Sequence, residues 1–173
     1  LARYEADSGR LPQNIAFHWQ STDLMWTNGE MYAQLLYLIG CEPIWDQGAR
    51  VKSFRVISLE ELGRARVDIT VRVSGITRDN FPNTIELLDE AVETVANLDE
   101  PEYLNFVRKH TKEKEAQGLD NRGATARIFC SMPGTYQAGT NLAVYASAWK
   151  DEKDLSDIYL FWNSFAYGRG MFG

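Results

Sequence analysis

Histidine side chains are the first places to look for chemistry in this sequence, because they supply bases and metal ligands. His18 and His110 are its two histidines, and neither belongs to an H-E-x-x-H or similar metal-ligand spacing. His18 lies in an apolar run, which favours a hydrogen-bonded core residue. His110 lies in a charged stretch, residues 108–112, where a plain surface position and a functional one both stay open.

Three glycine patterns resemble phosphate-binding motifs. Gly168-Arg169-Gly170-Met171-Phe172-Gly173 matches G-x-G-x-x-G, but it follows a predicted helix instead of joining a strand to a helix, so we expect no dinucleotide site. Residues 118–123 and 134–139 have the G-x-x-x-x-G spacing, with Ala124 and Thr140 where the phosphate-binding lysine belongs. The sequence therefore predicts that this chain binds no nucleotide by itself.

A cation and a carboxylate stand together in the segment Gly75-Ile76-Thr77-Arg78-Asp79, just before a predicted helix. A ligand carboxylate there would meet Arg78 and free backbone N–H groups. The alternative is that Arg78 and Asp79 only pair with each other or cap the helix.

The elements that position these residues follow from hydrophobic patterning. Residues 14–19 and 67–75 are predicted strands, and residues 51–59 are a possible third. A polar loop is expected at 20–23, and Asn28 is expected to cap a helix that runs through Ile39 and ends at Gly40. Pro82 starts an amphipathic helix that ends near residues 99–101. If the strands are parallel, residues 20–27 and 75–79 emerge at the same carboxyl edge, where open α/β sheets bind ligands.

From Tyr103 onward the sequence favours helices, with breaks at Gly118, Gly123 and residues 132–134. The predicted fold is therefore α/β, with a small mostly parallel sheet built from βα units and a helical C-terminal half. We expect one α/β segment over residues 1–173, with the βα core at 1–100 and the helical half at 101–173. The chain starts at Leu1 and stops in a glycine-rich stretch, so we expect it to be a piece of a longer polypeptide.

Composition excludes several classes of protein. Of 173 residues, 45% are hydrophobic and 24% charged, as in one globular domain. The formal net charge of −6 argues against a nucleic-acid or anionic-membrane surface. We find no membrane span and no signal peptide. Cys41 and Cys130 form no C-x-x-C pair or disulfide framework, so we expect buried apolar side chains in a cytoplasmic protein.

Several strings, read in order, resemble the large subunit of the cobaltochelatase and magnesium-chelatase family. They include Glu60-Glu61-Leu62-Gly63-Arg64-Ala65-Arg66-Val67-Asp68, Ser74-Gly75-Ile76-Thr77-Arg78-Asp79-Asn80-Phe81 and Leu87-Leu88-Asp89-Glu90-Ala91-Val92. The likeness continues at residues 98–101, 105–110, 126–129, 133–136, 149–152 and 165–168.

The resemblance implies a fragment of the porphyrinoid-binding subunit of an ATP-dependent chelatase. Such a subunit inserts a divalent metal into a tetrapyrrole of cobalamin-type or chlorophyll-type biosynthesis, while AAA+ ATPase and second chelatase subunits act as partners and hydrolyse the ATP. The ending at residues 165–170 favours cobalt over magnesium. No tightly bound cofactor is expected in this segment, since the metal is a substrate.

Metal insertion needs a base for the pyrrole N–H protons, a group that hands over the metal, and cations for the macrocycle's carboxylates. From the resemblance, His110 is the candidate base and metal ligand, and Asp79 is a second catalytic candidate. The candidate substrate-binding residues are Arg78, Arg108 and Arg127 for carboxylates, and Tyr136 and Tyr167 for ring stacking. Phe106 and His110 are four residues apart on a predicted helix, so we expect both to face inward, with Arg127 nearby.

Two other interpretations stay open. The segment can be a structural or docking module that contacts the AAA+ partner and holds no catalytic residue. It can also be an independent α/β protein that binds a small ligand, which the apparently cut ends make less favoured.

Overall fold

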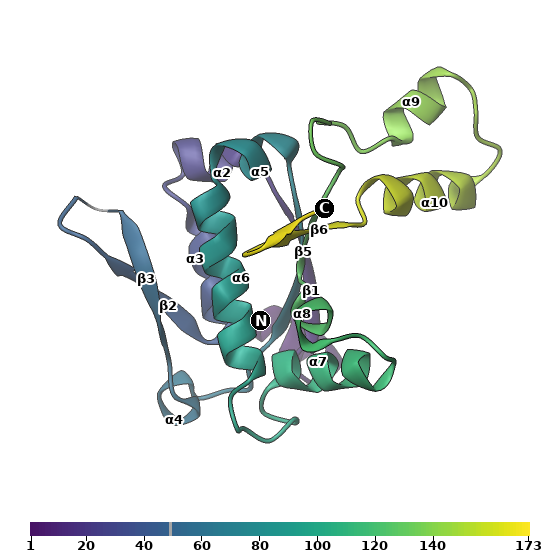
Figure 1. Ribbon diagram of the computed structural model, residues 1–173. Coiled ribbons are helices and arrows are strands. Elements are labelled where there is room, and N and C mark those ends of the chain that lie inside the picture. Colours follow the sequence, from purple (N-terminus) through teal and green to yellow (C-terminus); the bar gives the residue numbers. More distant parts are fainter. Residues whose placement is uncertain (49) are drawn as a thin grey trace.

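Alternating apolar residues make one strand the centre of the fold. Ile69, Val71 and Val73 are fully buried and define β4 (Asp68–Val73). A computed structural model, which describes residues 1–48 and 50–173, places β4 within a five-stranded sheet of order β1-β4-β5-β6-β7 (Figure 1). The other strands are β1 (Asn14–Trp19), β5 (Ile128–Cys130), β6 (Phe165–Gly168) and β7 (Met171–Phe172). β1, β4 and β5 are parallel, which confirms the predicted α/β class and mostly parallel sheet.

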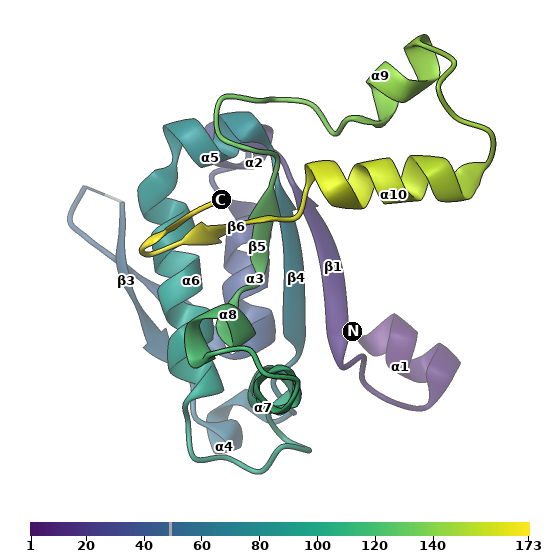
Figure 2. The ribbon, with the colours of Figure 1, turned by 45° about the vertical axis from the view of Figure 1, so that its right-hand side comes forward.

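Two amphipathic helices cover one face of this sheet. They are α3 (Glu30–Ile39) and α6 (Pro82–Ala96), which lie on the same side of β4 and β5 (Figure 2). Their apolar stripes are buried against the strands: Leu35, Leu36 and Ile39 of α3, and Leu88 and Val92 of α6, are each 0% exposed. Burial of these stripes supplies most of the apolar core.

The predicted cap of α3 is wrong by one residue. Gly29, not Asn28, precedes the helix and has a φ of 79°, a left-handed conformation that glycine adopts without strain. The N–H groups of Met31 and Tyr32 are instead satisfied by the buried Asp23 carboxylate, at 2.9 and 3.2 Å. Asp23, eight residues before Met31 in the sequence, therefore caps the helix in place of Asn28.

Several short elements connect the main ones. They are α1 (Ala2–Ser8), α2 (Ser21–Trp26), α4 (Leu59–Leu62), α5 (Gly75–Asn80) and the antiparallel hairpin of β2 (Cys41–Trp45) and β3 (Val51–Val56). The polar loop predicted at residues 20–23 is wrong, because α2 begins at Ser21. Residues 75–79, expected to precede the helix that starts at Pro82, themselves form most of α5. At α5, the Ser74 hydroxyl accepts the N–H of Thr77 and caps the helix.

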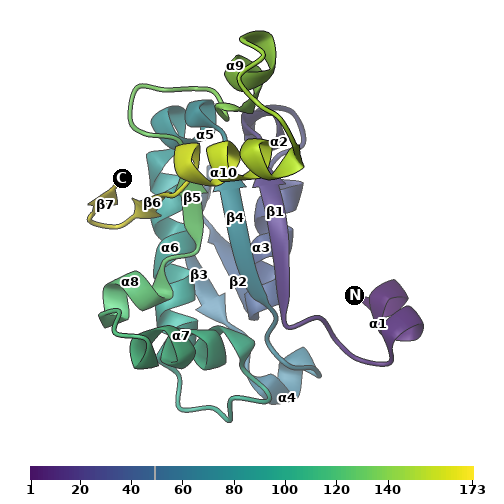
Figure 3. The same cartoon turned by 90° about the vertical axis from the view of Figure 1, so that its right-hand side faces the viewer.

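The C-terminal half contains the expected helices α7 (Phe106–Ala116), α8 (Asn121–Thr125), α9 (Thr140–Tyr145) and α10 (Glu152–Trp162). It also contains β5, β6 and β7, so the expectation of helix throughout was incomplete. Strands this short carry too little periodicity to be recognised, and pairing with β4 decides their conformation. Figure 3 shows α10 crossing in front of the carboxyl ends of the strands, while α7 lies near their amino ends. Within the described residues, no helix combines the length and apolar character needed to cross a membrane.

Candidate functional site

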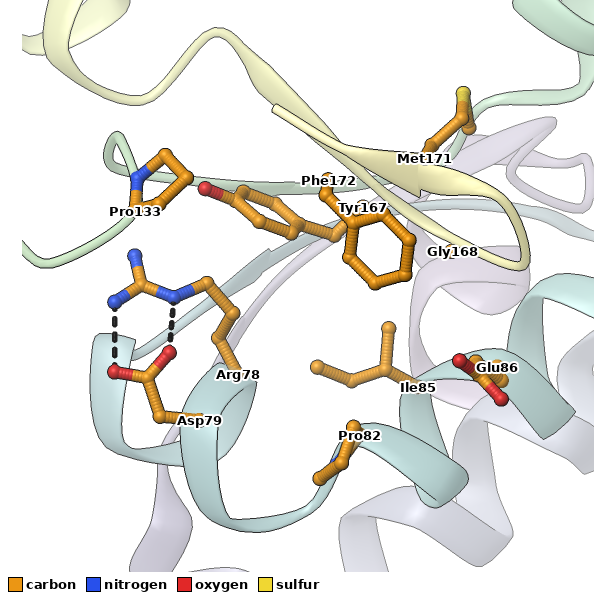
Figure 4. A pocket seen from close by; sticks show the side chains of 10 residues that line it. All are labelled: Arg78, Asp79, Pro82, Ile85, Glu86, Pro133, Tyr167, Gly168, Met171 and Phe172. Carbon is orange, nitrogen blue, oxygen red and sulfur yellow. Dashed lines mark hydrogen bonds and ion pairs between the residues drawn. The ribbon is translucent and has the colours of Figure 1, made fainter.

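The carboxyl edge of the sheet gathers side chains from α5, from the segment after β5 and from β6. Arg78 of α5 is at its centre and is only 6% exposed. Its Nη1 donates to the carbonyl oxygens of Ser131 and Met132, at 2.9 and 3.0 Å. Its Nε and Nη2 donate to the two Asp79 oxygens at 2.6 and 2.8 Å (Figure 4). Arg78 thus fastens α5 to the segment that follows β5 and also pairs with its neighbour.

Two aromatic rings flank this guanidinium. The Arg78 guanidinium carbon lies 5.6 Å from the ring centres of both Tyr136 and Tyr167, within the range of cation–π attraction. The Tyr167 hydroxyl donates to the Ser131 carbonyl at 2.8 Å. Gly75 allows Tyr136 to approach, because a Cβ at that position would lie 2.7 Å from its Cδ1 atom. Arg78, Tyr136 and Tyr167 are therefore brought together, as a shared binding site requires.

Asp79 is held as a carboxylate. The hydrogen bonds from Arg78 keep the pKa of the Asp79 carboxyl below its ordinary value of 3.8, against a smaller opposing effect of burial. A carboxylate with a lowered pKa is a weaker base than a free one, so its pairing with Arg78 makes Asp79 less suited to remove a pyrrole proton.

A cavity of about 160 Å³ adjoins this cluster. It lies between the start of α6 and the β6–β7 hairpin (Figure 4). Its lining residues are Arg78, Asp79, Pro82, Ile85, Glu86, Pro133, Tyr167, Gly168, Met171 and Phe172. Arg78 and Asp79 thus line a crevice at the predicted carboxyl edge in addition to forming a pair.

The amino edge of the sheet holds a second group, which is centred on His110. His110 Nδ1 lies 2.7 Å from Oδ2 of Asp68, the first residue of β4. The His110 side chain is 20% exposed and that of Asp68 only 1%. Phe106 is buried, so the predicted inward face of α7 is confirmed. The Asp68 contact leaves Nε2 as the ring nitrogen available to a ligand.

Arg127 completes this group. Its Nε donates to both Asp68 oxygens, at 2.8 and 3.1 Å, and its Nη1 donates to the Ala124 carbonyl at 2.7 Å. Burial raises the pKa of the Asp68 carboxyl, but the hydrogen bond from His110 and the charge of Arg127 outweigh it and leave that pKa below 3.8. An ionised Asp68 accepts a proton of Nδ1, so Nε2 of a neutral His110 carries the free electron pair.

The two groups lie at opposite edges. Asp68 and Val73 are the two ends of β4, roughly 17 Å apart along a strand, and Arg78 lies beyond Val73. His110 and Arg127 are therefore not part of the site formed by Arg78. Arg108 joins neither group: it donates to the Leu98 carbonyl and, at 3.1 Å, to Asp99, so it fastens the connection between α6 and α7.

Comparison with known proteins decides the family. The family model described as CobN/Magnesium Chelatase matches residues 1–173. The chain belongs to this family. It is 46% identical over 178 residues to the magnesium-chelatase subunit ChlH of rice, Oryza sativa subsp. indica, covering 99% of this chain and 13% of that protein. It is 37% identical over 182 residues to the aerobic cobaltochelatase subunit CobN of a Sinorhizobium species, covering 100% and 14%.

A solved structure supports the same family assignment. The catalytic subunit of cobaltochelatase from Mycobacterium tuberculosis superposes with a TM-score of 0.96 at 43% identity, covering 100% of this chain and 15% of that one. The chain therefore spans about one seventh of the length of these relatives.

The strings that resembled the chelatase family hold structural residues as well as candidate site residues. Arg66 is fully buried and donates to the carbonyls of Gly40 and Ile57, at 2.9 and 2.7 Å. It also binds the Glu100 carboxylate at 2.7 and 2.8 Å. Gly40 is required here, because a Cβ would lie 2.1 Å from Arg66 Nη1. This part of the chelatase pattern holds the amino edge together.

Two residues that support the sites were not predicted from the sequence. Asp68 supports His110, and Asp89 of α6 binds Arg122 at 3.0 and 2.6 Å and the N–H of Arg169 at 2.8 Å. Asp89 lies four residues after Ile85, on the apolar stripe of its helix. A charged residue on a buried helical face is a signal that a partner cation must exist.

Several smaller predictions can also be compared with the structure. The core position predicted for His18 is wrong: its side chain is exposed on the uncovered face of the sheet, beside Arg72 and 2.8 Å from Gln20 Nε2. Partial burial and the charge of Arg72 lower its pKa. Cys41 and Cys130 are both fully buried, as predicted, and burial raises the pKa of Cys41 to about 12.

The glycine-rich ending forms the β6–β7 hairpin, with Gly170 at a φ of 73°, whereas the glycines of a dinucleotide site lie in the turn between a strand and a helix. Among the described residues, no cluster of three or more His, Cys, Asp or Glu side chains can hold a metal ion.

Proposed function

We propose that this chain is part of the porphyrinoid-binding subunit of an ATP-dependent chelatase that inserts a divalent metal into a tetrapyrrole. The proposal is supported above all by the convergence of Arg78, Tyr136 and Tyr167 beside a cavity at the carboxyl edge. Flat aromatic macrocycles stack on tyrosine rings, and ligands of open α/β sheets bind at this edge. We assign ATP hydrolysis to separate AAA+ subunits, as the family resemblance implies, and the missing lysine in both G-x-x-x-x-G segments agrees with this assignment.

Within this proposal, Arg78 has mainly a supporting role. Four of its five N–H donors are already engaged by Asp79, Ser131 and Met132. A substrate carboxylate would have to displace Asp79 to gain a two-pronged contact. Tyr136 contacts the same pair through its ring and is 58% exposed, so part of the ring is open for stacking on a macrocycle.

Replacing Tyr136 tests the site. In the full-length subunit, Tyr136→Ala should weaken the binding of mesoporphyrin about tenfold, because it removes one stacking surface and leaves the buried Arg78 pair in place. Porphyrin fluorescence titration measures the affinity. Tyr145→Ala is the matched control, since Tyr145 is 94% exposed on α9 and should bind like wild type. Unchanged affinity in Tyr136→Ala would contradict the proposed site.

His110 is assigned the handling of the metal, because it lies too far from Tyr136 to remove pyrrole protons from a macrocycle bound there. Its Nε2 can bind a divalent cation in passing. Imidazole nitrogen suits cobalt, whereas magnesium prefers oxygen ligands, which supports cobalt over magnesium. Because His110 lies at the opposite edge from Tyr136, we place its action before the metal reaches the macrocycle. The contact with Asp68 holds the imidazole ring in position for this step.

A second substitution separates this role from a docking role. In the complete chelatase, His110→Ala should abolish Co²⁺ insertion while leaving mesoporphyrin affinity and partner-stimulated ATP hydrolysis intact. Lys112→Ala, which changes a half-exposed cation on the same helix, is the matched control. Insertion at the wild-type rate in His110→Ala would favour the alternative in which this segment docks the AAA+ partner.

One observation supports that alternative. Large apolar side chains gather on α9 and α10, where Tyr145 is 94%, Phe161 74% and Leu160 61% exposed. Exposed apolar clusters of this kind mark protein contacts. Under the docking alternative, Phe161→Lys should reduce partner-stimulated ATP hydrolysis, whereas Tyr136→Ala should not.

A further inference from the structure

One face of the parallel strands stays open between α7 and α10 (Figure 3). On this side, Asn14, Ala16 and His18 of β1 and Thr70 of β4 are exposed, and Arg72 of β4 is half-buried. These five side chains form what we call the open face. Parallel sheets normally have both faces covered, and α3 and α6 cover only the other one. In the part of the chain that the structure describes, the sheet therefore lacks part of a covering layer.

Arg72 carries a charge without an anionic partner. Its Nε donates to the Asn163 side-chain oxygen at 3.0 Å, and its Nη1 contacts Nε2 of His18. Among the described residues, no carboxylate pairs with Arg72, whereas the buried Arg78 and Arg127 each pair with one. A guanidinium that is partly shielded from water gains more from a carboxylate than an exposed one does. Arg72 is therefore a place where a carboxylate would bind favourably.

His18 shows the same shortage of acceptors. The Gln20 amide nitrogen lies 2.8 Å from His18 Nε2, the atom that Arg72 also contacts. Burial and the charge of Arg72 lower the pKa of His18, so the imidazole is neutral and Nε2 offers a single lone pair. Two donors therefore share one acceptor. A carboxylate has two oxygens that each accept hydrogen bonds, so it would supply the acceptors that this cluster lacks.

The longer polypeptide is the nearest source of such a carboxylate. The chain covers 14% of the Sinorhizobium CobN subunit and 15% of the solved cobaltochelatase subunit, so most of a subunit of this kind lies outside residues 1–173. A segment of the same polypeptide meets the open face at a high effective concentration. It also avoids the entropy cost of bringing two separate molecules together.

We propose that, in the full-length subunit, another segment of the same polypeptide covers the open face and pairs an aspartate or glutamate with Arg72. The inference rests on the proposed function only in taking this chain as part of a longer subunit. The incoming carboxylate accepts from the Nη groups of Arg72 and relieves the competition at His18. Ala16 and Thr70 are small, so the covering segment can pack closely on the strands beside this pair.

A photo-cross-linker at the rim of the open face tests the covering segment. In the full-length subunit alone, p-benzoylphenylalanine in place of Asn14 should link, within one polypeptide, to a peptide outside residues 1–173 that contains Asp or Glu. Mass spectrometry identifies this linked peptide. The same group in place of Arg3, whose side chain is 91% exposed on α1, is the control and should not link to it. No link from Asn14 within one polypeptide, a link to a second copy, or a link that forms only with the AAA+ subunit present would overturn the proposal.

Removing the charge of Arg72 tests the ion pair. Arg72→Gln should raise hydrogen exchange in the linked peptide about tenfold, because a hydrogen bond between charged groups is lost. Arg72→Lys keeps the charge without the two-pronged geometry and should give an intermediate rise. Arg3→Gln removes the same charge from the exposed pair with Asp7 and should leave exchange in the linked peptide unchanged.

The carboxylate gives an independent check. Changing the linked Asp or Glu to its amide should reproduce the effect of Arg72→Gln, and the double variant should add little to either single change. Unchanged exchange in the amide variant, or additive effects in the double variant, would overturn the pairing even where Arg72→Gln also loosens α10 through Asn163. None of these measurements needs a porphyrin, so a subunit that fails to bind mesoporphyrin would refute the proposed function and leave the cross-link unaffected.

Discussion

Replacing Asp68 with asparagine would remove one charge from the amino edge and keep nearly the same shape. Arg127 would then remain charged, with its side chain 2% exposed and no counter-ion at Nε. Breaking a buried ion pair by removing one partner costs about 3–5 kcal/mol, which is a large part of the total stability of about 5–15 kcal/mol of an ordinary domain. Local opening of β4 and α7 should therefore increase at least about a hundredfold.

Hydrogen exchange in the full-length subunit measures this opening, peptide by peptide. Asp99→Asn is the matched control, because it breaks the pair with Arg108 at a fully exposed carboxylate and should cost less than about 1 kcal/mol. The double variant Asp68→Asn/Arg127→Met should recover most of the protection, since the cost lies in the unpaired charge. Exchange in Asp68→Asn within about threefold of wild type, or no recovery in the double variant, would refute the reasoning.

Two further predictions concern a glycine and acid stability. Gly168→Ala should displace the β6–β7 hairpin, because the new Cβ would lie 2.3 Å from Asp89 Cγ. Limited proteolysis should then cut this variant at the hairpin. Gly170→Asn is the control and should stay resistant, because a Cβ at Gly170 lies in open space. The folded pKa of Asp68 is lowered, so its stabilisation is complete above about pH 5 and is lost as the pH falls below 3.8 toward that folded pKa. The protection factor, which corrects for the slower intrinsic exchange in acid, should therefore fall as the pH is lowered for wild type and change less in Asp68→Asn. Equal acid responses would exclude Asp68 as the cause.

The sequence predicted the parts of the fold that have a clear period. The alternation from Val67 to Val73 gave β4, and the apolar stripe of α6 gave the helix that covers it. The pattern could not give β5, because three residues contain no measurable alternation. Its conformation comes from pairing with β4, through Val71 and Arg72, and such long-range contacts are not visible in local propensity.

The candidate site was predictable only in part. Parallel pairing correctly brought Arg78 to the carboxyl edge, and the spacing of Phe106 and His110 correctly turned the histidine inward. Spacing could not show that the two groups lie at opposite ends of β4, since that depends on where α7 crosses the sheet. It also could not show that Asp68 contacts the His110 ring, because an aspartate in a strand fits a solvent-facing position equally well.

The order of the strands has a consequence for how this chain folds during synthesis. β1, β4 and β5 are neighbours in the same order in which they leave the ribosome, so the parallel part of the sheet can assemble while the chain is still growing. The contact between Asp89 and the N–H of Arg169 joins residues 80 apart, and contacts of such long separation form late. The cavity draws its walls from Pro82 through Phe172. It is therefore among the last features to appear, and a chain that stops growing before β6 lacks the walls that Tyr167, Gly168, Met171 and Phe172 supply.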